Sequence, residues 1–199
     1  MNKTLVIGGG IAAVLVLAVV FAFSGANETA EGLAFGEVTV DGATLPVFEA
    51  GTNDPAIGAP GPVLSGADVD GNPVTIGGPG EPRIVLFLAH WCSHCQAEVP
   101  RVTDYLAAND VDVEFLSVAT SSNATAPNYP PSVWLEREEW PVPTLYDDAA
   151  NTAGTAYGLS GFPFWAILDG DGVVQSRFSG EVSTEQLQAV VDFASTLSG

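Results

Sequence analysis

RIVLFLAHWCSHCQAEVP, residues 83–100, is the stretch of this chain that decides the fold. It begins with an uncharged apolar run, residues 84–89, which is typical of a central β-strand covered on both faces. The chain's only two cysteines, Cys92 and Cys95, follow with two residues between them. The next residues predict a helix over 96–108 with one apolar face, so the pattern is strand, cysteine pair, helix.

This arrangement favours thiol chemistry. A strand that leads into a helix would place Cys92 at the helix N-terminus, where unpaired N–H groups and the helix dipole favour a thiolate, the nucleophilic form. Cys95 follows one turn later, close enough to form a disulfide with Cys92. One sulfur would attack a partner's disulfide and the other would resolve the mixed disulfide. His94 would add a donor or positive charge beside Cys92, which makes the disulfide more oxidising.

Three other interpretations of the cysteine pair fit its spacing less well. A structural disulfide across four residues would remove little entropy from the unfolded chain. A zinc site needs four ligands, and His90 and His94, the only histidines, lie too close to the cysteines to surround one ion. A buried, inert pair is not expected where a strand turns into a helix. The motif therefore favours redox chemistry that needs neither a metal nor a cofactor.

The residues around the cysteines resemble the active site of the thioredoxin-like superfamily, above all its membrane-anchored, extracytoplasmic TlpA/ResA-like thiol–disulfide oxidoreductases. The resemblance covers about residues 55–199 and implies a thioredoxin-like α/β fold, a central mixed β-sheet flanked by helices. The Ser93-His94 dipeptide departs from it, because this pattern is more familiar from DsbA-type oxidants, whereas reducing members commonly carry proline before the second cysteine. The matching positions are Trp91, Cys92, Cys95, Glu98 and Pro100, with Gly161-Phe162-Pro163 in the loop that carries the family's cis-proline.

The resemblance also implies how the cysteines meet a client. Cys92 would attack and Cys95 would resolve. Pro163 would be cis and lie against the pair, although the sequence alone is equally compatible with a trans bond at the start of a strand. Phe162 would offer backbone groups with which an incoming peptide pairs as a short strand. Trp91 would pack beside the cysteines and shield them.

Glu98 is the acidic residue that the resemblance places near Cys95, where it would assist proton movement. A partly buried carboxyl with a raised pKa suits this task; an exposed glutamate on the helix surface is the alternative. The buried aspartate that thioredoxin carries on the strand before the motif is absent, because Leu86 occupies that place. His90 is expected to be a solvent-exposed spacer.

The direction of the exchange is less clearly indicated. His94 favours an oxidant that donates its disulfide to newly exported proteins, whereas the overall resemblance favours a reductant for a dedicated client, such as apocytochrome c or a copper-site protein. In either case a membrane redox partner would have to reset the single cysteine pair. A non-catalytic binding module on a thioredoxin scaffold is a third alternative, which an intact cysteine pair and cis-proline loop disfavour.

Net charge excludes one class of partner, and an apolar stretch near the N-terminus predicts where the protein is located. The 199 residues carry 24 acidic and 5 basic side chains, a net charge of −19, which excludes nucleic acid as a partner. Residues 4–23 are uncharged and about as long as the ~20 apolar residues that span a bilayer. Lys3 before them and acidic residues after them predict a single-pass anchor with the N-terminus in the cytoplasm and the domain outside. A cleavable signal peptide is the alternative.

We therefore expect an anchor over residues 1–24, an extracytoplasmic linker over 25–59, in which a strand pair around Asp41-Gly42 and a flexible tether are alternatives, and a thioredoxin-like domain over 60–199. The remaining pattern predicts a hairpin around Asp70-Gly71, a strand near 111–119 parallel to residues 84–89, helices over 133–140 and 151–157, a hairpin of 164–168 with 173–178, and a last helix capped by Ser183 or Thr184.

Overall fold

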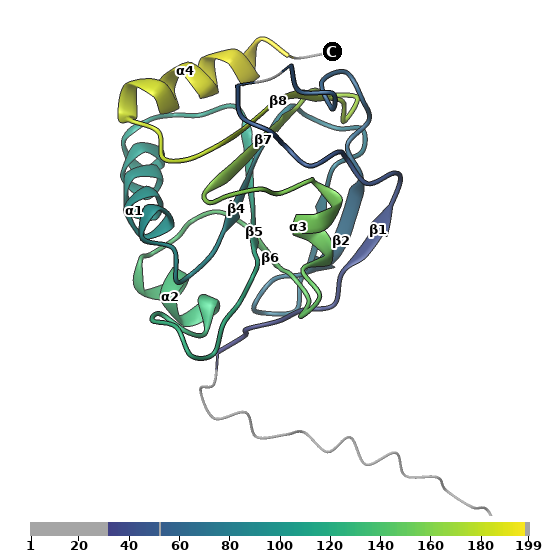
Figure 1. Ribbon diagram of the computed structural model, residues 1–199. Coiled ribbons are helices and arrows are strands. Elements are labelled where there is room, and N and C mark those ends of the chain that lie inside the picture. The colour runs from purple at the N-terminus through teal and green to yellow at the C-terminus, as the bar shows by residue number, and fades with distance from the viewer. Residues whose placement is uncertain (1–31, 52, 198–199) are drawn as a thin grey trace, which may run out of the picture. The chain divides into compact units, whose positions relative to one another are not determined.

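The computed structural model describes residues 32–51 and 53–197 (Figure 1). The predicted anchor and the alternative signal peptide lie outside these residues. Within the described ranges, no helix has the length and apolar character that a membrane crossing requires.

Five strands form a central mixed sheet in the order β6-β5-β4-β7-β8 (Figure 1). β4 lies in the middle, parallel to β5 and antiparallel to β7, so that Ile84 faces Phe115 on one side and Ile167 on the other. The predicted central strand and its parallel neighbour are therefore confirmed. The strand bounds are Arg83–Leu88 for β4, Glu114–Ala119 for β5, Thr144–Tyr146 for β6, Phe164–Leu168 for β7 and Val174–Ser179 for β8.

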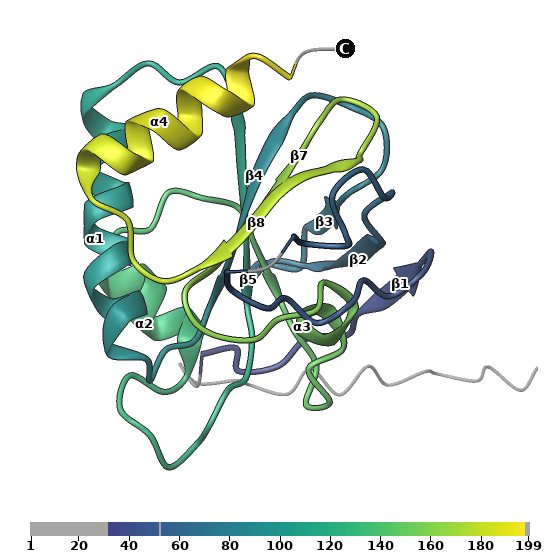
Figure 2. The same ribbon diagram turned by 45° about the horizontal axis from the view of Figure 1, so that its top comes forward.

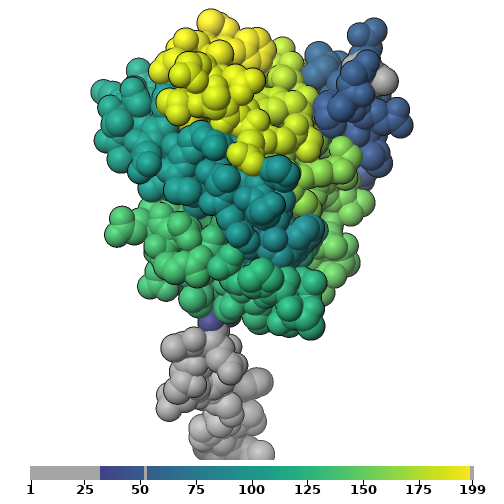
Figure 3. All heavy atoms as spheres, turned by 60° about the vertical axis from the view of Figure 1, so that its left-hand side comes forward, coloured from purple at the N-terminus to yellow at the C-terminus, as the bar shows by residue number. Residues whose placement is uncertain are grey.

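Helices cover both faces of this sheet. In Figure 2, α1, α2 and α4 lie on one side, and α3 lies on the other with a second, smaller sheet. Figure 3 shows the first side, where α4 in yellow packs directly against the blue-green segment that contains α1. The helices are shorter than predicted at α2 and α3, and α1 begins three residues earlier, directly after Cys92. Their bounds are Ser93–Ala108 for α1, Pro131–Arg137 for α2, Thr152–Ala156 for α3 and Thr184–Ser195 for α4.

The two faces of β4 pack into two separate cores because successive side chains of a strand point to opposite sides. Ile84, Leu86 and Leu88 pack towards α1, α2 and α4. Val85 and Phe87 pack towards α3 and the smaller sheet. All six residues of β4 are buried, which explains why the five residues after Arg83 are all apolar.

The smaller sheet has the order β1-β2-β3, with β1 at Thr39–Asp41, β2 at Val63–Ala67 and β3 at Pro73–Ile76. The hairpin of β2 and β3 was predicted. Asp68 caps its turn by accepting hydrogen bonds from the N–H groups of Asp70 and Asn72.

The segment before residue 60 is part of the folded unit. β1 does not form a strand pair within that segment; it pairs with β2 instead. Residues 32–51 and 53–59 belong to the same compact unit as the sheet and helices described above. Local pattern does not mark this part of the fold, because a short strand in a Gly- and Thr-rich stretch resembles a flexible tether.

A buried ion pair fastens the same segment to β8. Arg177 donates from Nε to Asp54 Oδ2 at 2.9 Å and from Nη2 to Asp54 Oδ1 at 2.5 Å. Its Nη1 donates to the carbonyl oxygens of Pro46 and Tyr157. The Arg177 hydrogen bonds hold the pKa of Asp54 below its ordinary value. The pair therefore contributes its full stabilisation at pH values above the ordinary carboxyl pKa. This contribution is lost as the pH falls through the lowered pKa of Asp54.

Replacement of Asp54 by alanine should destabilise the protein by about 3 kcal/mol, because it leaves the Arg177 guanidinium buried without a counter-charge. Urea denaturation near neutral pH would measure this loss. Asp110→Ala removes an exposed carboxyl and serves as the control. Equal stability of the two variants would contradict the structural role given to the pair.

Candidate active site

The end of β4 and the start of α1 position the two cysteines. The N–H of Cys92 donates to the carbonyl of Ala89 at 3.0 Å, and the carbonyl of Cys92 accepts the first helical hydrogen bond, from Gln96. Cys92 is thus the N-cap residue of α1. Cys95 lies one turn further along and is fully buried, with its Sγ accepting a hydrogen bond from the N–H of Ala89 at 3.4 Å. Both cysteines are free thiols within hydrogen-bonding reach of each other.

The two thiols differ in their surroundings. Cys92 is 9% exposed and lines an open pocket of about 500 Å³, whereas Cys95 has no exposed surface. Burial is the main cause that raises the pKa of Cys95, and the nearby Glu98 adds to it. A partner's sulfur can therefore reach Cys92 from this pocket, and Cys95 is reached only from within the protein.

The cis-proline loop lies beside Cys92. The Phe162–Pro163 bond is cis, as the resemblance predicted. The Sγ of Cys92 donates to the carbonyl of Phe162 at 3.9 Å. The Phe162 ring meets the indole of Trp91 edge-on at 5.7 Å, and the Trp91 Nε1 donates to the carbonyl of Ser121 at 2.7 Å. Trp91 and Phe162 thus form two walls of the pocket into which Cys92 opens.

Glu98 lies on the buried face of α1. It has no exposed surface, so the alternative of a surface glutamate is wrong. Its Oε2 accepts hydrogen bonds from Arg101 Nη1 at 2.9 Å and from the N–H of Val182 at 3.0 Å. Its Oε1 is buried without a partner. Burial raises the pKa of Glu98 to about 7, against the lowering effects of Val182 and Arg101. Oε1 is therefore the oxygen that is free to carry a proton.

His90 is not the exposed spacer that the sequence predicted; it is fully buried. Its Nε2 accepts from the N–H of Asn123 at 3.0 Å, so its Nδ1 carries the proton and donates to the carbonyl of Pro127 at 2.7 Å. Burial lowers the pKa of His90 and favours this neutral form. His90 holds the loop after β5 against the active site.

His94 is exposed, and its side chain pairs with the carboxylate of Glu181. Its Nδ1 pairs with Glu181 Oε1 at 2.5 Å, and Glu181 Oε2 accepts from Arg101 Nη2 at 3.3 Å. Of the hydrogen bonds of the described residues, none joins His94 to Cys92. Arg101, three residues after Glu98, was within reach of sequence reasoning as a helical ion pair. Glu181 was not, because it lies in the β8–α4 loop and nothing local marks it.

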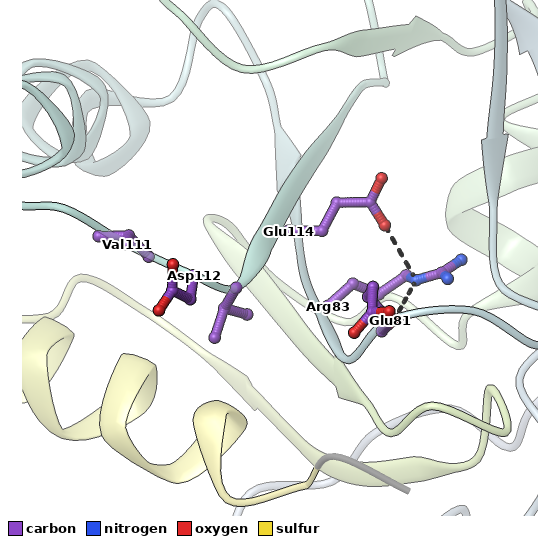
Figure 4. Close-up of a pocket in the computed structure, with 6 residues that line it drawn as sticks. Glu81, Arg83, Val111, Asp112 and Glu114 are labelled. Carbon is purple, nitrogen blue, oxygen red and sulfur yellow. Dashed lines mark hydrogen bonds and ion pairs between the residues drawn. The ribbon is translucent and has the colours of Figure 1, made fainter.

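A second hollow, of about 470 Å³, lies where β4 and β5 begin (Figure 4). The cysteines lie beyond the other end of β4. Arg83 contacts Glu114 and the carbonyl of Glu81 there. This hollow contains no thiol. In residues 32–51 and 53–197, no group of three or more His, Cys, Asp or Glu side chains is placed to hold a metal ion.

Comparisons with known proteins agree with this geometry. Over 128 residues the chain is 31% identical to the methylamine utilization protein MauD of Methylobacillus flagellatus, covering 62% of this chain and 57% of that protein. Over 117 residues it is 28% identical to the thiol:disulfide interchange protein DsbE of Haemophilus influenzae, covering 57% of this chain and 61% of that protein. The matches thus span about three fifths of the length of these relatives.

StoA from Bacillus subtilis, a solved structure, matches with a TM-score of 0.55 at 21% identity, over 68% of this chain and 98% of that one. At this identity the likeness supports the fold, and the predicted thioredoxin-like fold with a central mixed sheet is confirmed. The model of the Redoxin family matches residues 41–194, which include both cysteines, the cis-proline loop and Glu181. The chain therefore belongs to the Redoxin family, with the thioredoxin-like, TlpA/ResA-like character that its sequence predicted.

Proposed function

We propose that this protein is a thiol–disulfide oxidoreductase that exchanges disulfides with protein clients through Cys92 and Cys95. The observation that carries this proposal is the pairing of one reachable thiol at the N-cap of α1 with one fully buried thiol a turn below it. The similarity to the Haemophilus influenzae thiol:disulfide interchange protein supports the same class of reaction.

In the reducing direction, the Cys92 thiolate attacks one sulfur of a client disulfide. The Cys92–client S–S bond forms, the client's own S–S bond breaks, and the other client sulfur leaves as a thiolate that takes up a proton. The Cys95 thiol then gives its proton to Glu98, and its thiolate attacks Cys92 Sγ. The Cys92–Cys95 bond forms and the second client sulfur leaves, so two electrons have passed to the client. Oxidation of a client runs the same steps in reverse.

The pocket beside Cys92 is the proposed client site. Trp91 and Phe162 give it apolar walls, and backbone groups of the cis-proline loop border it, so an extended peptide can pair with this loop while its cysteine meets Cys92 Sγ. Trp91 is 39% exposed although it is a large aromatic residue, which is typical of a surface that meets a partner.

The direction of transfer has two candidates. The Ser-His dipeptide between the cysteines favours an oxidant, for the reason that a positive imidazole near Cys92 stabilises the reduced form. One observation favours a dedicated reductant instead: His94 pairs with the Glu181 carboxylate, which offsets its charge. A reductant of this kind would serve a specific client, such as apocytochrome c or a copper-site protein.

The proposed location is the outer side of the cell membrane, with the N-terminus in the cytoplasm and residues 1–24 as a single-pass anchor. The apolar stretch over 4–23 and the positive Lys3 before it support this orientation. Because the chain holds one cysteine pair, a membrane thiol–disulfide partner must restore its redox state after each exchange.

The reduction potential of the Cys92–Cys95 couple, measured on the full chain against glutathione, separates the two directions. A value near about −120 mV identifies an oxidant, and a value near about −270 mV or below identifies a reductant. Insulin reduction and refolding of a reduced client should each require the cysteines and be absent in Cys92→Ser, whereas Cys95→Ser should accumulate the mixed disulfide. Failure of the wild type in both assays would favour a binding module instead.

Glu98→Gln should slow the resolving step about a hundredfold, because Cys95 loses the base that takes its proton. In the wild type this step should become faster as the pH rises through about 7, where Glu98 turns into its carboxylate, and the variant should lack this rise. Stopped-flow release of a client from the Cys92 mixed disulfide measures the rate. Asp104→Asn, on the exposed face of α1, is the matched control.

Stability gives an independent check on Glu98. Since the folded protein holds the Glu98 proton up to about pH 7 and the unfolded chain releases it near 4.5, the folded state binds more protons between these values. Wild-type stability should therefore fall across this window by about 3 kcal/mol relative to Glu98→Gln. An equal slope in both proteins would contradict the raised pKa.

A further inference from the structure

His94 and Glu98 lie on opposite sides of Cys95 in the sequence, yet two charged residues connect them. We propose that Glu181, acting together with Arg101, is a positioning residue that offsets the charge of His94 and adjusts how readily Glu98 releases its proton, and so restrains the oxidising power of the Cys92–Cys95 pair. This inference rests on the proposed function and deepens it, because it assigns a regulator of the same site.

The β8–α4 loop delivers Glu181 to α1. This loop joins Ser179 to Thr184 and passes beside α1 (Figure 2). The next residue, Val182, is buried and donates its N–H to Glu98. The loop is therefore fixed against α1 at the residue next to Glu181, which keeps the Glu181 carboxylate close to the helix.

The contacts form one unbroken series. His94 Nδ1 meets Glu181 Oε1 at 2.5 Å, Glu181 Oε2 meets Arg101 Nη2 at 3.3 Å, and Arg101 Nη1 meets Glu98 Oε2 at 2.9 Å. Arg101 thus uses its two terminal nitrogens on two different carboxylates. Every carboxylate oxygen in the series is occupied except Glu98 Oε1, which stays buried and unpartnered.

Fold stability does not account for this series. The His94 side chain is 65% exposed and that of Glu181 is 32% exposed, and ion pairs with such exposure add little to stability. Arg101, in contrast, contacts the fully buried carboxylate of Glu98, where water screens charges less, and His94 belongs to the cysteine motif itself. The series therefore acts on the thiols and Glu98 rather than on the fold.

Glu181 and Arg101 act on Glu98 in opposite directions. Among the described residues, the charged or titratable groups that act on Glu98 are Arg101 and Cys95 on α1 and Glu181 in the loop. Arg101 lowers the pKa of Glu98 and Glu181 raises it, on top of the larger effect of burial. The His94 hydrogen bond, in turn, is the main cause that holds the pKa of Glu181 low and keeps it negative.

Glu181→Gln should therefore make the couple more oxidising. Without the carboxylate, a protonated His94 would act on the Cys92 thiolate unopposed, and the equilibrium with glutathione should move towards the reduced protein by about tenfold, or about 30 mV. The measurement uses the full chain, equilibrated against glutathione.

A double-mutant cycle identifies His94 as the intermediary. In a His94→Gln background, Glu181→Gln should change the equilibrium constant with glutathione by no more than about twofold, compared with His94→Gln alone. Glu185→Gln removes an exposed carboxylate from the first turn of α4 and should leave the potential unchanged. An equal shift with and without His94, or with Glu185→Gln, would overturn the proposal, as would an unchanged potential in Glu181→Gln.

The pH profile of the resolving step tests the effect on Glu98. Glu181→Gln should move its midpoint to lower pH and Arg101→Gln to higher pH, because one removes a negative and the other a positive neighbour. Midpoints that move in the same direction would contradict the network. The wild type is assayed first: if it exchanges no disulfide, the proposed function fails, and if it exchanges them but the variants do not differ from it, only this inference fails.

Discussion

The site depends on the burial of one face of α1, where Cys95 and Glu98 lie three residues apart without exposed surface. Burial penalises the charged form of both groups, so a thiolate and a carboxylate are unfavourable there at the same time. Glu98 accepts its two hydrogen bonds on Oε2, and its Oε1 has no partner. Cys95 therefore keeps its proton, whereas Glu98 takes up or releases one near neutral pH, and Cys92 lies at the edge of this buried face.

The fold brings four distant segments to this face. β4 supplies the turn that carries the cysteines, and β7, its antiparallel neighbour, begins directly after the cis-proline loop. The loop after β5 is held by His90, and the loop after β8 supplies Val182 and Glu181. These segments converge because the loops at the end of β4, at the end of β5 and before β7 lie at the same edge of the sheet.

The features that could be predicted from the sequence are those marked by local pattern or by the family resemblance. The strand, the cysteine pair, the following helix and the cis bond at Pro163 were each marked by spacing within a short stretch. Burial of His90 was not predicted, because it depends on contacts with the loop after β5, which local sequence does not mark. Glu181 was beyond prediction, because its partners are set by how the loop between β8 and α4 packs, and this is a property of tertiary structure rather than of local sequence.

The contact between Val182 and Glu98 has a consequence for how the protein is made. The cysteines and α1 leave the ribosome well before residues 181 and 182, because synthesis starts at the N-terminus. Until that loop reaches α1, Glu98 lacks its backbone donor and His94 its carboxylate, and the cysteine pair is an ordinary dithiol on an incomplete sheet. On the roles proposed for Glu98 and Glu181, the reactivity of the thiols therefore depends on docking of the β8–α4 loop against α1.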